Sequence, residues 1–199
     1  STTSTLNHAY LHIELTMQSD QDTFCNLAFH PYFCLDHSGS VAEHYLQIHG
    51  EHFLPLDSTN LPTGEVKKVE GTSFDFTQKK KIASFVKAEP QTLDHNFCYF
   101  HTHQSGDEPT VIHPQAQLYS PLSNIHLAIS SNQLGLQVYC PSDLGHEPSD
   151  PRPRHSYPAV CLEPQGWPAA PKYPHFPSIV VRKNDLYRQH TLIKLSLTQ

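Results

Sequence analysis

Hydrophobic and polar residues alternate with a period of two in several short segments of this chain. Residues 10–17 show the alternation first, and it returns in residues 115–119, 125–130, 134–139 and 191–197. Because successive side chains of a strand point to opposite faces, each segment predicts a strand with one buried face. In the first segment, the face expected to be buried carries Leu11, Ile13, Leu15 and Met17.

Shorter apolar segments and turn signals lie between these strands. Residues 44–49 and 53–54 predict a pair of short strands, and Pro62-Thr63-Gly64 predicts a tight turn before the next strand. Residues 79–85 are the one stretch with moderate helix compatibility. Residues 166–177 are too rich in proline for regular structure.

The strand pattern and the length together predict the architecture. Strands recur at short spacing with turn signals between them, and the sequence has no long amphipathic helix pattern. A chain of 199 residues is large enough to bury one sizeable core. We therefore expect an all-β fold, a large antiparallel β-sandwich that forms a single domain over residues 1–199.

Composition and charge narrow the classes of partner. The formal net charge is −6 and the longest basic run is three lysines, so nucleic acid is not an expected partner. No apolar stretch reaches membrane-spanning length, so a membrane is not expected either. Five cysteines without a C-x-x-C pair predict reduced thiols, which favours a cytoplasmic location.

Three polar groups interrupt apolar strand segments and are the candidates for chemistry. His30 lies within residues 26–35, Glu163 lies within residues 160–165, and Asp94 opens an apolar segment together with His95. Burial of an imidazole or a carboxylate is costly unless it is paired or does chemistry. Taken singly, each is more simply a satisfied core group. Together, His30 and Glu163 fit a general acid and a general base.

Other chemistries find less support in the sequence. Sixteen histidines raise the possibility of a metal site, with His95 close to His101 and His103, but no carboxylate stands at ligand spacing, so we expect no metal. A serine hydrolase is not indicated, because the G-x-S-x-G motif is absent. Trp167 and Tyr32 either offer aromatic faces to a sugar ring or belong to the core.

A series of motifs resembles the aldose 1-epimerase (galactose mutarotase) family. Residues 26–35, Asn-Leu-Ala-Phe-His-Pro-Tyr-Phe-Cys-Leu, are similar to the family segment N-L-x-x-H-x-Y-F-N-L. Further similar segments follow in the family's order, and the likeness runs from about Tyr10 to Leu197. These segments are residues 54–57, 62–66, 71–76, 94–97, 134–139 and 161–165.

The resemblance implies a fold, a reaction and a set of site residues. It implies a β-sandwich of the galactose mutarotase type that interconverts the α and β anomers of free aldohexoses, without a cofactor. Glu163 would be the general base on the anomeric hydroxyl, and His30 the general acid on the ring oxygen. Asp94 would bind sugar hydroxyls, with Tyr32 and Val138 as further substrate contacts.

The chain also departs from the family pattern. Phe29 and Cys34 stand where the family usually has Asn, and Thr77 stands where it usually has Arg. Family members run to well over three hundred residues, and this chain resembles their C-terminal portion. The N-terminal portion, which in the family supplies an Arg and a His, is expected to come from a companion fragment or chain.

Three alternatives remain open on the sequence. A non-catalytic carbohydrate-binding or sensor protein on the same fold needs no matched acid and base, so the presence of both disfavours it. A sugar-phosphate epimerase would need clustered cations, for which Arg152 and Arg154 in the proline-rich segment 141–158 are the candidates. A histidine-based metal protein is the least favoured.

Overall fold

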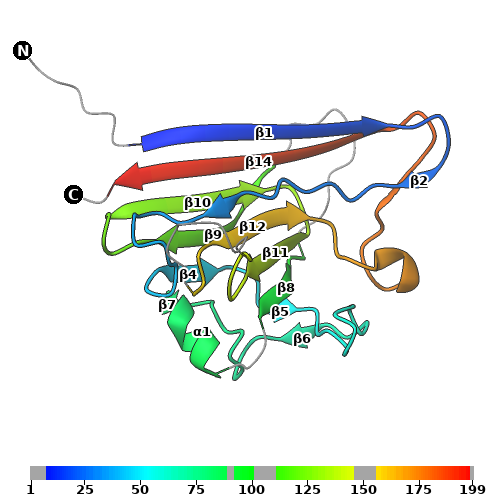
Figure 1. Ribbon diagram of the computed structural model, residues 1–199. Helices are drawn as coiled ribbons and strands as arrows, with labels where there is room; N and C mark the ends of the chain where they lie inside the picture. Colours follow the sequence, from blue (N-terminus) through cyan, green and yellow to red (C-terminus); the bar gives the residue numbers. More distant parts are fainter. Residues whose placement is uncertain (1–7, 89–91, 101–110, 146–155, 198–199) are drawn as a thin grey trace, which may run out of the picture.

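The computed structural model describes residues 8–88, 92–100, 111–145 and 156–197 and shows two six-stranded sheets packed face to face (Figure 1). The first sheet has the order β1-β14-β10-β9-β4-β7 and the second has the order β3-β12-β11-β8-β5-β6. Every pairing between neighbouring strands is antiparallel. The predicted all-β class and antiparallel sandwich are confirmed.

The two sheets and a small third sheet, β13-β2, draw their strands from along the whole described chain. The strands of the first sheet are β1 (His8–Gln18), β4 (Tyr45–Ile48), β7 (Lys80–Lys81), β9 (His113–Tyr119), β10 (Ile125–Ser131) and β14 (Leu186–Leu197). Those of the second are β3 (Tyr32–Phe33), β5 (His52–Phe53), β6 (Lys67–Lys68), β8 (Leu93–Cys98), β11 (Gly135–Cys140) and β12 (Val160–Gln165). The third sheet pairs β2 (Thr23–Phe24) with β13 (Val180–Val181).

One hydrophobic core fills the space between the two large sheets. Alternate residues of β4, β9 and β10 enter it from the first sheet, and alternate residues of β8, β11 and β12 enter it from the second. This burial follows from the period-two pattern, because one face of each strand is apolar. The fully buried members include Leu46, Leu118, Ile129, Phe97, Leu136, Val138 and Val160.

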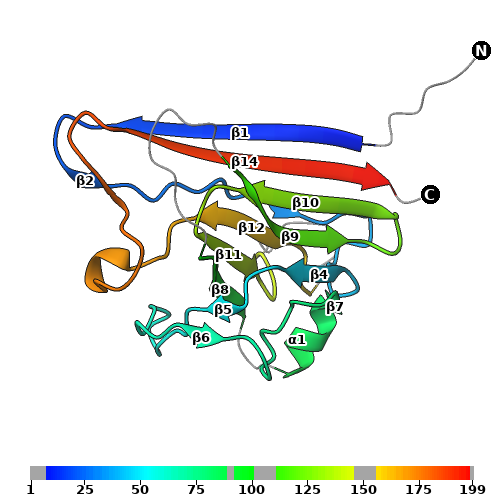
Figure 2. The ribbon, with the colours of Figure 1, turned by 180° about the vertical axis from the view of Figure 1, so that it is seen from behind.

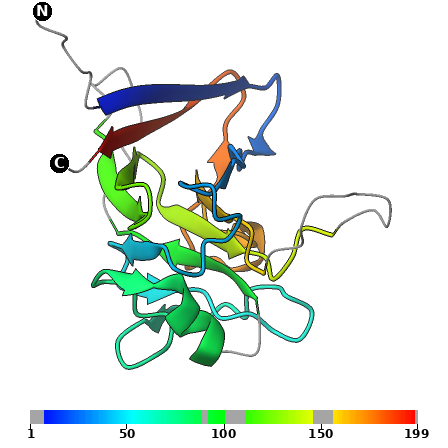
Figure 3. The same ribbon diagram turned by 60° about the vertical axis from the view of Figure 1, so that its left-hand side comes forward.

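The long pair β1 and β14 lies at the rim of the molecule, away from α1 (Figure 3). The outward edge of β1 has no strand partner among the described residues. Ile13, Leu15 and Met17 are half-buried as expected, but Leu11 is 52% exposed. The expectation for Leu11 is wrong because its end of β1 extends beyond the core. Leu195 and Leu197 at the end of β14 are exposed beside it.

Residues 44–49 and 53–54 do not pair with each other as the sequence predicted. β4 joins the first sheet next to β9, whereas β5 joins the second sheet next to β8. The chain crosses between the sheets near Gly50, where an added Cβ would lie 3.2 Å from the Cys98 carbonyl oxygen. Glycine, which has no Cβ, permits this close approach at the crossing.

The predicted helix is present, and the proline-rich segment packs in an irregular conformation. The helix α1 spans Ile82–Ala88 and buries Ile82 and Phe85, close to the expected residues 79–85. The segment 166–177 contains only the short 3-10 turn η1 (Ala170–Lys172) and packs its aromatic rings on the 62–66 turn. Gly64 has a φ of +91° and faces the ring of Tyr173, so a side chain there would be both strained and obstructed.

No helix in the described residues is long and apolar enough to cross a membrane. Seen from behind, α1 is a short element at the end of the molecule opposite β1 and β14 (Figure 2).

Candidate active site

The central strands of the second sheet place five polar or reactive side chains on the face turned away from the core. Glu163 and Cys161 project from β12, Gln137 and Tyr139 from β11, and Asp94 from β8. In the sheet register Gln137 is opposite Glu163, and Tyr139 is opposite both Cys161 and Asp94. Since side chains alternate along a strand, residues in register share a face.

His30 reaches this face from the loop between β2 and β3. One end of the loop is attached to Gly166, the residue that follows β12, and the other end to β12 itself. The Asn26 side chain accepts a hydrogen bond from the Gly166 backbone N–H at 2.7 Å and donates one to the Gly166 carbonyl at 3.1 Å. After the loop, β3 pairs with β12, with Tyr32 opposite Cys161. The loop therefore spans β12, which explains how His30 meets a residue 133 positions later in the chain (163 minus 30).

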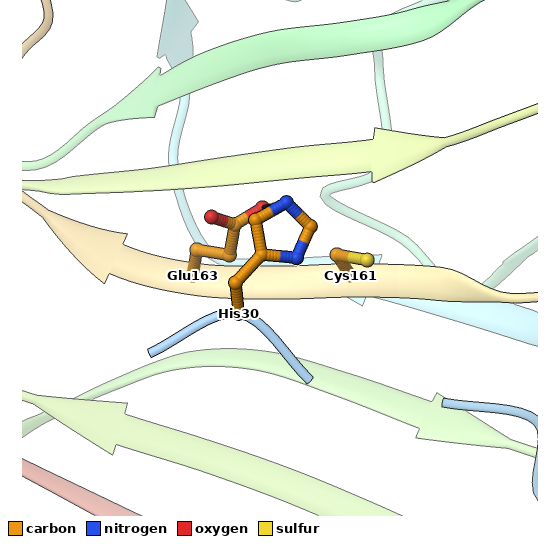
Figure 4. Close-up of side chains that lie close together, drawn as sticks. All are labelled: His30, Cys161 and Glu163. Atoms are coloured by element: carbon orange, nitrogen blue, oxygen red, sulfur yellow. Dashed lines mark ion pairs between the residues drawn. The ribbon is translucent and has the colours of Figure 1, made fainter. Parts of the chain in front are cut away.

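His30 and Glu163 form the central pair of the site (Figure 4). His30 Nε2 lies 3.4 Å from Glu163 Oε1, and the side chains are 46% and 6% exposed. The His30 ring stacks on the Tyr32 ring, with centroids 5.1 Å apart. The Tyr139 ring meets the His30 ring in a T-shaped contact, with centroids 6.3 Å apart. The imidazole is accessible from solvent while two aromatic rings limit its orientation.

The environment of Glu163 shifts its acidity toward neutral pH. Burial raises the pKa of Glu163 to about 7, the nearby His30 opposes this rise, and the negative charge of Asp94 adds to it. A carboxylate with a pKa near the working pH is suited to accept and return a proton. This group is therefore a general base candidate on physical grounds.

Asp94 is held in place by Gln137, a residue that the sequence analysis did not single out. Gln137 Nε2 donates a hydrogen bond to Asp94 Oδ1 at 2.6 Å. Both side chains are half-buried on the face that carries Glu163. The available signal was a polar residue, Gln137, between apolar neighbours of a strand, the same signal that identified Glu163.

Four of the five predicted site residues, His30, Glu163, Asp94 and Tyr32, come together on this face. Val138 does not, because its side chain is fully buried in the core on the opposite face of β11. The substrate contact of Val138 stays a prediction, and the side chains on the site face of β11 are those of its neighbours Gln137 and Tyr139.

Trp167 and His95 do not join the site either. Trp167 is 2% exposed in a separate cluster, and its indole N–H donates to the Leu134 carbonyl at 2.5 Å. His95 points into the core, where its ring packs against those of Phe53 and Phe74. His101, His103, Arg152 and Arg154 lie outside the described residues.

A second cluster has the same residue types and begins with Cys34, at the end of the His30 segment in the sequence. Cys34, Asp36 and His44 bring a thiol, a carboxylate and an imidazole nitrogen within 4.8 Å, as do Cys161, Glu163 and His30. In this second cluster the Leu35 backbone N–H donates to His44 Nε2 at 3.0 Å, and the Ser120 hydroxyl donates to Asp36 Oδ2. His44 Nε2 is therefore an acceptor.

Comparison with known proteins places the chain in a family. A family model described as aldose 1-epimerase matches residues 1–194. The galactose mutarotase of Rattus norvegicus is 31% identical over 202 residues, covering 98% of this chain and 56% of that protein. The aldose 1-epimerase of Escherichia coli is 33% identical over 174 residues, covering 83% of this chain and 49% of that protein.

Solved structures show the same fold. The structure of an aldose epimerase homologue from C. elegans superposes with a TM-score of 0.80 at 27% identity, covering 96% of this chain and 57% of that chain. The chain thus spans about half the length of the relatives that it matches. Because the family model matches nearly the whole length of the chain, the chain belongs to the aldose 1-epimerase family.

Proposed function

We propose that this chain carries the acid–base centre of an aldose 1-epimerase that interconverts the α and β anomers of free aldohexoses such as glucose and galactose. The observation that carries the proposal is the His30–Glu163 pair, 3.4 Å apart, with the pKa of the carboxyl raised by burial to about 7. The pair stands on a sheet face that also presents Asp94 and Gln137 for hydroxyl groups.

The proposed reaction needs one proton removed and one delivered. The Glu163 carboxylate takes the proton from the anomeric hydroxyl, while protonated His30 gives a proton to the ring oxygen. The bond between C1 and the ring oxygen breaks as the C1–O double bond forms, leaving an open-chain aldehyde. Rotation about the C1–C2 bond presents the other face of the carbonyl, and the reverse proton transfers close the ring. Neither group is consumed, and no cofactor is required.

Asp94, Gln137 and Tyr32 are assigned to substrate binding. The Asp94 carboxylate accepts hydrogen bonds from sugar hydroxyls, and the bond from Gln137 at 2.6 Å fixes its orientation. Tyr32 is 50% exposed next to His30 and offers an aromatic face to the apolar side of a sugar ring.

The proposal includes a companion N-terminal portion that completes the sandwich. The chain covers 56% of the rat relative, the outer edge of β1 has no strand partner among the described residues, and Tyr10, Leu11, Leu195 and Leu197 of β1 and β14 are exposed. An open edge with apolar side chains is a surface that proteins normally cover. We place residues 1–199 as one domain portion of such an assembly, in the cytoplasm, where its five free cysteines stay reduced.

The test is polarimetry of freshly dissolved α-glucose and α-galactose. The chain is assayed alone and together with the N-terminal portion of a relative, and Glu163→Gln is compared with the unchanged chain. Acceleration that Glu163→Gln abolishes supports the proposal. If the complete assembly binds sugar but is inert, the acid–base assignment is wrong and the chain belongs to a carbohydrate-binding protein.

A further inference from the structure

We propose that His30, Cys161 and Glu163 also form a binding site for a zinc ion, and that zinc bound there inhibits the acid–base pair. The three side chains offer an imidazole nitrogen, a thiol sulfur and a carboxylate oxygen, all within 4.8 Å of one another. They lie side by side over β12 (Figure 4). Zinc is bound in proteins by this set of donor atoms.

The separations are close to those that tetrahedral zinc imposes. With Zn–N, Zn–O and Zn–S bonds of about 2.0–2.3 Å, neighbouring ligand atoms stand roughly 3.3–3.6 Å apart. His30 Nε2 and Glu163 Oε1 are already 3.4 Å apart. From the outer limit of 4.8 Å, the sulfur needs to approach by roughly 1.2–1.5 Å at most, which side-chain rotation supplies.

The backbone holds the three ligands in place. Cys161 and Glu163 are two residues apart on β12 and therefore share a face. The His30 loop is attached to the same strand through Asn26 and β3. The His30 side chain is 46% exposed, so it retains room to turn, and a fourth ligand such as water can approach from its side.

The charge of the site suits a divalent cation. Zinc binds a thiol as the thiolate and displaces its proton. With the Cys161 thiolate, the Glu163 carboxylate and a neutral His30, the bound ion and its ligands have no net charge, which favours burial. In the absence of a cation, burial and the negative charges of Glu163 and Asp94 raise the pKa of Cys161 to about 12, so the thiol is protonated and unreactive.

The second cluster of the same residue types does not offer a comparable site. The lone pair of His44 Nε2 is engaged by the Leu35 backbone N–H at 3.0 Å. The Cys34 thiol donates to the Asp36 carbonyl at 3.4 Å, and Asp36 accepts from Ser120 and from the Ser38 N–H. A metal would have to break these bonds in a buried position, so Cys34 provides a matched control for Cys161.

Inhibition by zinc rests on the proposed epimerase function of the site, whereas zinc binding does not. Zinc on His30 Nε2 and Glu163 occupies the lone pairs that would transfer protons. Sugar and zinc would therefore compete for the free site.

The experiment measures zinc binding first, without sugar. The chain is titrated with Zn²⁺ against a competing chelator dye, and with Co²⁺, whose thiolate complex has a near-ultraviolet charge-transfer band. We expect one tight site with that band and release of the thiol proton. Cys161→Ser should lose the band and weaken Zn²⁺ binding by at least about 100-fold, the upper end of the loss caused by a merely supporting residue.

Two control variants exclude other sites. Cys34→Ser removes the thiol of the second cluster, and His12→Ala breaks a surface histidine pair in which His12 Nε2 lies 3.2 Å from His190 Nδ1. Both should bind Zn²⁺ as the unchanged chain does. Loss of the tight site in either control, or its retention in Cys161→Ser, would overturn the inference. Near-ultraviolet circular dichroism of each variant verifies that it is folded.

The inhibition is tested separately in the preparation that accelerates mutarotation. Zn²⁺ should slow mutarotation by the unchanged protein, and a chelator should restore the rate. Inhibition of Cys161→Ser, measured against its own zinc-free rate, should need at least about 100-fold more Zn²⁺. Zinc that binds through Cys161 without slowing an active assembly overturns the inhibition. If no assembly is active but the cobalt band is present, the metal site stands and the proposed function fails.

Discussion

This fold contains two clusters of histidine, carboxylate and cysteine, and they differ in how many of their polar atoms already have partners. In the first, His30 is 46% exposed, and its one ion-pair partner among the described residues is Glu163. In the second, His44 and Asp36 have side chains 1% and 3% exposed and hydrogen bonds from Leu35, Ser38 and Ser120.

The difference shows in the direction of the pKa shifts of the two carboxyls. Burial raises the pKa of Glu163 to about 7. Burial also acts to raise the pKa of Asp36, but hydrogen bonds from Ser120 and Ser38 outweigh it, and the net pKa is lowered. A carboxylate stabilised by several donors is a fixed structural anion, whereas one without them retains a proton that it can exchange near neutral pH.

The largest difference between the clusters should appear in catalysis. Glu163→Gln is expected to slow mutarotation by about 10²–10⁴-fold, because an amide cannot take the proton from the anomeric hydroxyl. Asp36→Asn, the matched change in the second cluster, should leave the rate within a few fold. Polarimetry of both variants in the active assembly checks this, and an equal loss in both would remove the distinction.

The second cluster should dominate stability. His44→Leu removes the acceptor of the buried Leu35 N–H, and an unsatisfied buried donor costs about 1–3 kcal/mol in the free energy of unfolding. His30→Leu lacks such a penalty because its ring is half exposed. Urea unfolding of the two variants measures the difference, and a smaller loss for His44→Leu than for His30→Leu would contradict it.

Glu163 itself should lower stability at alkaline pH. Its folded pKa of about 7 lies above its ordinary value of 4.5, so its contribution to stability is complete below pH 4.5 and is lost as the pH rises through 7. Glu163→Gln should therefore raise the free energy of unfolding at pH 9 by up to about 3 kcal/mol and change it little at pH 4. Unfolding curves at the two pH values test the sign, and a larger gain at pH 4 would refute it.

The pH dependence of catalysis provides the finest comparison. The reaction needs ionised Glu163 together with protonated His30, so the ionisation of Glu163 should set the rise on the acid side of the kcat/KM profile, at about pH 7. Gln137→Glu adds a like charge opposite Glu163, which should move this rise up by roughly one pH unit. Gln137→Met serves as the uncharged control, since it frees Asp94 without adding charge. An unchanged pH profile in Gln137→Glu would show that another group controls the rate.

Much of the site could be predicted from the sequence because its residues interrupt apolar strands. His30, Glu163 and Asp94 were recognisable in this way, and the structure brings them together with Tyr32. Gln137 shows the same pattern and was overlooked. Val138 lies next to Gln137 and Tyr139 but is buried in the core, because a shift of one residue along a strand moves a side chain from the outer face to the inner one.

The sequence by itself determined which segments become strands and which of their faces are apolar, because these properties depend on a local period of two. Only the tertiary structure decided which strands are neighbours, and it separated residues 44–49 from 53–54 into different sheets. It also decided which histidine is available for chemistry. The two histidines have similar sequence surroundings, because His30 precedes Pro and Tyr and His44 precedes Tyr and Leu. Only the fold directs the Leu35 N–H to His44 and sets a buried carboxylate beside His30. Hydrogen-bond partners and desolvation arise from segments distant in sequence, so the local pattern does not contain them.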